Sequence, residues 1–139
     1  MLTRALLIGL LLCGVAAPAF GEDAKLVALG LADHEVSLEE LAKGAPPVPK
    51  FNTPAIAYVS AANLKKGDVV EISLANNEKA LLTSTETLAE DKAAYLLQAG
   101  KRGVPAGGWP AEWTYSAQVK IMRDGKTLIE RATKPIPFE

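Results

Sequence analysis

The clearest pattern in the chain is a strict alternation of apolar and polar residues between positions 113 and 121. An alternation of this length predicts a β-strand with one face in the core and one in water. Asp124-Gly125 follows, a pair typical of a two-residue hairpin turn, and 126–132 then pairs back. The residues expected to face the core are Trp113, Tyr115, Ala117, Val119 and Ile121.

Short apolar or alternating runs recur along the rest of the chain, separated by turns. Gly67 in the turn 63–68 and the Asn pair in 76–78 mark two of those turns. About seven short strands at this spacing predict an all-β sandwich or barrel. The other expected strands are 25–31, 55–61, 69–75, 79–85, 93–99 and 126–132.

One short helix is expected near the N-terminus. Ser37 with Glu40 three residues later forms a capping box, and Gly44 suits the exit, so 37–44 is predicted to be helical for one or two turns. The stretch 45–54 carries four prolines and is expected to be an extended connection. The polar stretch 86–93 fits either a loop or a single helical turn.

The strand around Tyr115-Ser116-Ala117 resembles the sixth strand of an immunoglobulin-like sandwich. In that family a Tyr lies two residues before an inter-sheet Cys, and its hydroxyl bonds to backbone upstream. Here Ala117 takes the Cys position, as in domains of this kind without a disulfide. The resemblance to bacterial exported immunoglobulin-like domains implies a fold and no particular function.

The pattern of the N-terminal residues predicts a secretory signal peptide. Arg4 is followed by an apolar run from Leu6 to Val15 and then by small residues. We expect cleavage after Gly21, or alternatively after Ala19, giving a signal peptide over 1–21 and a single sandwich domain over 22–139. The alternative is a lipoprotein anchored at Cys13. The apolar run is too short to span a bilayer, and no later segment is expected to do so.

Removal of residues 1–21 would leave 118 of the 139 residues and no cysteine, so neither a disulfide nor a thiolate site is expected. Without Arg4, 14 basic residues face 16 acidic ones, a net charge of −2. This balance does not favour nucleic acid or an anionic membrane surface as a partner.

The loop 100–110 is the best candidate for a binding site. Four glycines and two prolines shape it, and it carries Lys101, Arg102 and Trp109. Trp109 either points outward as a contact for a sugar or peptide, with Lys101 and Arg102 beside it, or folds over the open end of the sandwich as a lid. We favour the lid.

Catalytic and metal-binding signals are weak. His34 is the single histidine; with Asp33 and Glu35 it could begin a metal site, but neighbouring residues converge poorly, and a solvated turn is the expected alternative. No nucleophile elbow, phosphate loop or dinucleotide fingerprint occurs. Acidic pairs such as Glu39-Glu40 are read as solvated. We therefore expect no cofactor, no metal and no enzymatic activity.

Two functions remain. The first is a non-catalytic periplasmic or secreted module that binds another cell-envelope protein through a sheet edge or the 100–110 loop. The second is a binding domain for a small ligand or carbohydrate that uses Trp109.

Overall fold

The computed structural model describes residues 23–139 apart from 78, 102 and 111. The expected signal peptide, both cleavage sites and Cys13 lie outside the described residues. Within them, seven strands form two antiparallel sheets, which confirms the all-β prediction. One sheet has the order β2 (Lys25–Ala32), β3 (Ala55–Leu64), β6 (Lys92–Lys101); the other has the order β5 (Lys79–Thr87), β4 (Val69–Asn76), β7 (Tyr115–Arg123), β8 (Lys126–Ala132).

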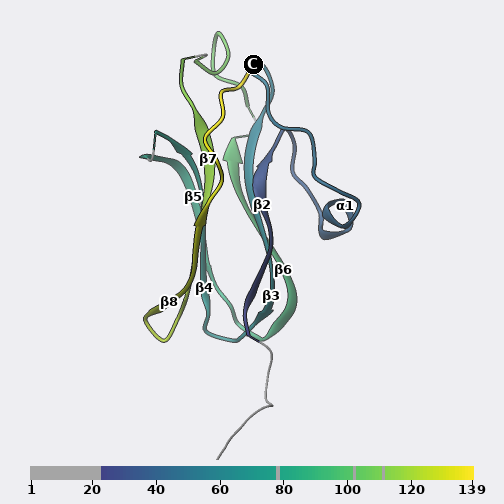
Figure 1. The fold of residues 1–139 in the computed structure, drawn as a ribbon, viewed down its shortest axis with the longest axis vertical. Helices are drawn as coiled ribbons and strands as arrows, with labels where there is room; N and C mark the ends of the chain where they lie inside the picture. The colour runs from purple at the N-terminus through teal and green to yellow at the C-terminus, as the bar shows by residue number, and fades with distance from the viewer. Residues whose placement is uncertain (1–22, 78, 102, 111) are drawn as a thin grey trace, which may run out of the picture.

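The two sheets lie face to face as two layers (Figure 1). The apolar sets of β4 and β7 are paired residue by residue, for example Val70 with Ile121 and Ile72 with Val119. These four side chains are at most 2% exposed, so the alternation in the sequence does place them between the layers. One continuous apolar cluster joins them to inward residues of the other sheet.

Strand β3 is buried on both faces over most of its length. Its inner face, with Val59, belongs to the core between the sheets. On its outer face Tyr58 packs with Ala32 and Val36, because the segment that contains α1 (Leu38–Ala42) folds back over this sheet. Figure 1 shows α1 outside the layer formed by β2, β3 and β6.

The predicted helix is confirmed as α1. The Ser37 hydroxyl accepts a hydrogen bond from the Glu40 backbone N–H at 3.0 Å, as expected of an N-cap. The Glu40 carboxylate contacts His34. The hairpin turn between β7 and β8 is confirmed too, since Asp124 and Gly125 have φ values of 53° and 78°. The stretch 86–93 contains no helix; β5 continues to Thr87 and β6 begins at Lys92.

Candidate functional site

Trp109 closes one end of the sandwich, which confirms the lid interpretation. Its side chain is only 7% exposed and belongs to the core cluster. The indole N–H donates to the Thr53 carbonyl at 2.8 Å, and the backbone N–H donates to the Phe51 carbonyl at 2.8 Å. The polar edge of the ring is therefore satisfied inside the protein, as a buried tryptophan requires.

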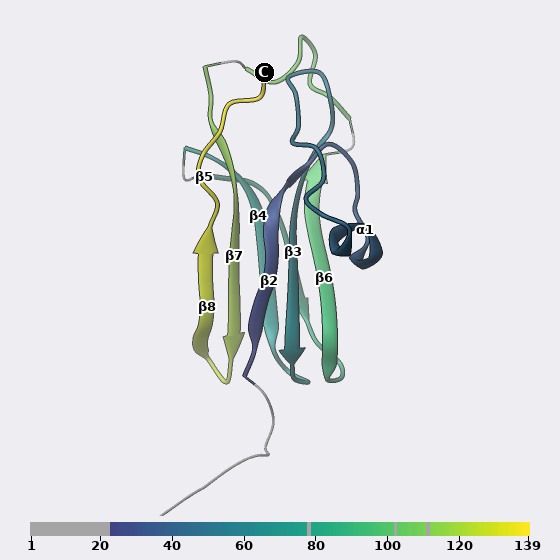
Figure 2. The ribbon, with the colours of Figure 1, turned by 45° about the vertical axis from the view of Figure 1, so that its right-hand side comes forward.

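An aromatic cluster holds Trp109 in this position. Its ring meets Tyr115 edge-on, with centroids 5.7 Å apart, and meets Phe138 edge-on at 5.8 Å. Tyr115 and Phe138 stack at 4.1 Å. The C-terminal segment brings Phe138 here by pairing Ile136 with Tyr115. Figure 2 shows the end of the chain running beyond β8 to this end of the sandwich.

Trp113 was predicted to lie in the core, and this prediction is wrong. Its side chain is 39% exposed. The strand begins only at Tyr115, and the Trp113 backbone N–H closes a turn onto the Pro110 carbonyl at 3.3 Å. Because the residue belongs to a turn, the two-residue alternation does not extend to it. Its ring lies tilted against Tyr115, with centroids 6.4 Å apart.

Gly108 allows the loop to approach the 51–54 turn. Its φ is +85°, and a Cβ there would lie 2.7 Å from the Phe51 carbonyl oxygen. No larger residue fits without moving the backbone, so this glycine has a packing role as well as a conformational one.

Between this loop and β5 lies an apolar hollow of about 390 Å³ that opens to solvent. Leu81 and Leu82 of β5 form one wall and are 39% and 36% exposed. Both can line it because a β-bulge shifts the register at this point: Leu74 pairs with Leu82, and Ala75 with Ala80, which leaves Leu81 as the extra residue. The remaining lining residues are Leu74, Pro105, Ala106, Gly108, Trp109, Pro110 and Trp113.

Of the two basic residues predicted as contacts, the structure describes the position of Lys101 only. Lys101 ends β6, where it pairs with Ala55. Arg102 lies outside the described residues.

Of the predicted contact residues, Trp109 lines the hollow. The exposed lining residues Leu81, Leu82 and Trp113 are not among the contacts predicted from the sequence. The two leucines have a signal in the sequence, because adjacent leucines in a run without charge are unusual in an edge strand.

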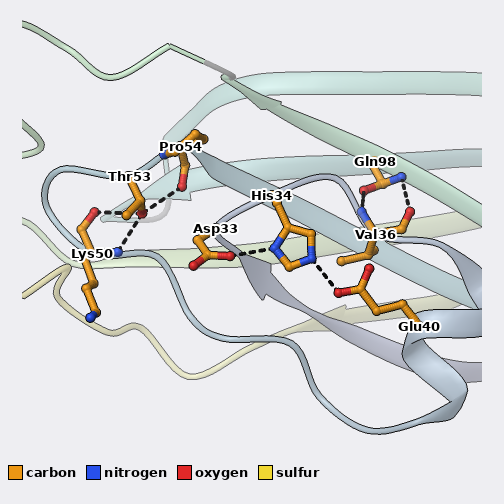
Figure 3. Close-up of polar contacts among 8 residues, drawn as sticks. All are labelled: Asp33, His34, Val36, Glu40, Lys50, Thr53, Pro54 and Gln98. Atoms are coloured by element: carbon orange, nitrogen blue, oxygen red, sulfur yellow. Dashed lines mark hydrogen bonds and ion pairs between the residues drawn. The ribbon is translucent and has the colours of Figure 1, made fainter.

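His34 lies in an exposed turn, as expected from the sequence, and two carboxylates bind its ring there (Figure 3). Asp33 approaches Nδ1 at 2.6 Å, and Glu40 of α1 approaches Nε2. Hydrogen bonds to Asp33 and Glu40 raise the pKa of the imidazole, because both stabilise the protonated ring. The carboxylates lie at opposite ring nitrogens, so the three side chains do not converge on one point. Among the described residues no group of three or more His, Cys, Asp or Glu could hold a metal ion.

Gln98 of β6 binds the segment between β2 and α1 to the outer face of the sheet formed by β2, β3 and β6. Its side-chain amide accepts from the Val36 N–H at 2.7 Å and donates to the Val36 carbonyl at 2.9 Å. Further along, the Thr53 hydroxyl accepts from the Lys50 N–H at 2.9 Å and ties the turn that offers its carbonyl to Trp109 (Figure 3). The β2–β3 connection thus supports both the outer face of this sheet and the lid.

A scan of protein-family models finds no match to this chain, and a search of curated proteins finds no significant similarity. In the part of the chain that the structure describes, no helix has the length and apolar character to cross a membrane.

Proposed function

We propose that this chain is a non-catalytic, exported protein-interaction module with an immunoglobulin-like fold. The strand order supports the fold: the first, second and fifth described strands form one sheet, and the third, sixth and seventh lie together in the other. The fourth, β5, pairs with β4, whereas constant-type immunoglobulin domains place their fourth strand in the opposite sheet. Burial of Tyr115 and Ala117 at the start of β7 also agrees with this class.

The observation that carries the function is the open apolar hollow beside Trp113. Its exposed walls are tryptophan and leucine, residues whose apolar surface a partner side chain can cover. Tryptophan is enriched among the residues that dominate binding energy at protein interfaces. The partner that we propose is another cell-envelope protein, which inserts an apolar side chain between Trp113 and Leu81.

The non-catalytic assignment is supported by the state of the single histidine. Both ring nitrogens of His34 are engaged by carboxylates, so the imidazole has no free nitrogen to act as a general base. The sequence offers no recognised nucleophile motif to compensate.

A small-ligand or carbohydrate site is the alternative, and the size of the hollow favours it. About 390 Å³ falls at the lower end of the range of small-molecule pockets, roughly 300–1,000 Å³. In this alternative Trp113 supplies the exposed ring face, since Trp109 is buried.

Capture of partners from an envelope extract tests the proposal when variants are compared. Trp113→Ala and Leu81→Ala are expected to lose the captured protein, and Leu128→Ala to keep it, because Leu128 is equally exposed but lies on β8. Loss of capture with all three variants, or with none, would contradict the proposal. A glycan array or a tryptophan fluorescence titration that responds to Trp113→Ala, without protein capture, would establish the alternative.

A further inference from the structure

The outer edge of β5 is, among the described residues, an unpaired sheet edge made almost entirely of exposed residues. Eight of its nine residues are exposed, and no described strand pairs with that edge. From Ala80 to Thr85 it has neither a charge nor a proline, the features that usually block pairing with another strand. The edge strand β8, by contrast, carries Lys126, Glu130 and Arg131, and β2 is mostly half-buried or buried.

The two charges of β5 are opposite in sign and stand near its two ends. In the register with β4, Glu86 pairs with the buried Val70, and Lys79 pairs with Asn76. Val70 and Asn76 are an even number of residues apart and so point to the same face of the sheet. Lys79 and Glu86 are seven residues apart, an odd number that would normally place them on opposite faces of β5. The extra residue of the bulge, Leu81, shifts this alternation by one, so Lys79 and Glu86 also share one face.

We propose that β5 pairs in antiparallel direction with β5 of a second copy of this chain, about a two-fold axis through Thr83. Each Thr83 then lies opposite the other, Leu82 lies opposite Ser84, and the bulged Leu81 is skipped on both strands. With that skip, Thr85 lies opposite Ala80, and Glu86 lies opposite Lys79 of the second copy. The interface is self-complementary, as a two-fold dimer requires.

Charge complementarity indicates that the strand that pairs with β5 comes from a second copy of this chain. In this register each Lys79 meets a Glu86 on the same face, giving two opposite-charge pairs with no like-charge pair, and directly opposed charges of this kind stabilise strand pairing. Glu86 is held at the edge by a hydrogen bond from the Tyr95 hydroxyl of the facing sheet. Pairing would also satisfy the open backbone edge and cover part of the exposed Leu81 and Leu82. The argument for this dimer does not rest on the proposed function. Because pairing covers part of Leu81, which also lines the hollow beside Trp113, a second copy and the proposed partner would compete for that residue.

Analytical ultracentrifugation of charge variants tests the dimer. The protein is expected to dimerise with a Kd below about 1 mM. Lys79→Glu should raise the dimer Kd about tenfold or more, because two cross-strand pairs change from attraction to repulsion. Adding Glu86→Lys to that variant reverses both charges and should restore dimerisation. Lys126→Glu, the same change at the β8 edge, is the control and should leave Kd near that of the unchanged protein.

A cross-link gives a second test that does not depend on how the Glu86 variant folds. Directly opposed Cβ atoms in an antiparallel pair are about 4.5–5.5 Å apart, close enough for a disulfide after a small adjustment. In a Cys13→Ser background, Thr83→Cys should form a covalent dimer on mild oxidation, and Thr127→Cys on β8 should not. A monomer up to about 1 mM, equal responses to Lys79→Glu and Lys126→Glu, failure of the double charge reversal in a folded protein, or no preference for the Thr83→Cys cross-link would each overturn the proposal.

Discussion

The guanidinium group of Arg123 donates two hydrogen bonds to the carboxylate of Asp68, each 2.8 Å long. Asp68 is fully buried and lies in the turn between β3 and β4, whereas Arg123 ends β7 and is partly exposed. The Lys65 backbone N–H also donates to the carboxylate, at 2.8 Å. The Leu88 N–H donates to the Asp68 carbonyl at 2.9 Å. Asp68 thus ties together three connections at the end of the sandwich opposite the aromatic lid.

Arg123→Ala is expected to destabilise the fold strongly, because it leaves a buried carboxylate without its charged partner. Breaking such a pair typically costs about 3–5 kcal/mol, and the partial exposure of Arg123 places the expected loss at the lower end. Urea unfolding measures it. Arg131→Ala, which removes an exposed arginine from β8, is the control and should cost little. Equal losses in the two variants would mean that the Asp68 pair contributes nothing specific.

The same pair predicts an acid dependence of stability. Burial alone would raise the pKa of Asp68, but hydrogen bonds from Arg123 and the Lys65 backbone outweigh it, so the pKa lies below its usual value. The stabilisation is therefore fully present above the unfolded value, about 3.9, and is lost as pH falls through the lower folded value. Urea midpoints of the unchanged protein and of Asp68→Asn, compared from neutral to acid pH, should converge. A constant gap would contradict this assignment.

His34 predicts the opposite pH dependence at α1. Hydrogen bonds to Asp33 and then Glu40 raise the pKa of His34. Its contribution to holding α1 is fully present below the unfolded value, about 6.5, and is lost as pH rises through the folded value. Because His34 is the single histidine, its ring protons give an unambiguous NMR titration. Glu40→Gln should lower the measured pKa, whereas Glu39→Gln, on the same helix, should change it much less.

Much of the fold could be predicted from local patterns, whereas the candidate site could not. Strand alternation, the Ser37 cap and the Asp124-Gly125 turn depend on residues that are close in sequence. The positions of Trp109 and Phe138 depend on contacts with distant residues, Thr53 and Tyr115. The alternation in the sequence continues to Trp113 without a break, and only the turn onto Pro110 separates that residue from the strand.

Trp109 is buried and Trp113 is partly exposed, and one substitution at each position tests this difference directly. Trp109→Ala removes a buried ring and its hydrogen bond and should cost about 3–5 kcal/mol. Trp113→Ala removes a partly exposed ring and should cost much less, about 1 kcal/mol or below. Urea denaturation followed by circular dichroism compares them, since fluorescence would change with either substitution. A larger loss for Trp113→Ala would restore the original assignment of this residue to the core.

The Tyr115 hydroxyl differs from the immunoglobulin-like expectation, and this difference gives the last prediction. The side chain is fully buried, but the hydroxyl has no hydrogen-bond partner among the described residues, and neither has the Asn76 amide nitrogen. The two residues face each other in the β4–β7 register. Burial raises the pKa of Tyr115, and the Asn76 amide offsets only part of that rise, because it approaches the hydroxyl without the geometry of a hydrogen bond.

Tyr115→Phe should therefore be close to neutral or slightly stabilising. A buried hydroxyl without a partner has lost its hydrogen bonds to water, and its removal relieves that cost, which is about 1–3 kcal/mol for a typical group. Tyr115→Ala is the contrast, because it deletes the ring that stacks on Phe138 and should cost about 3–5 kcal/mol. Urea unfolding of both variants measures the effect of the hydroxyl apart from that of the ring. A loss of more than about 1 kcal/mol for Tyr115→Phe would mean that the hydroxyl donates a net stabilising hydrogen bond, as in the tyrosine corner of immunoglobulin-like domains.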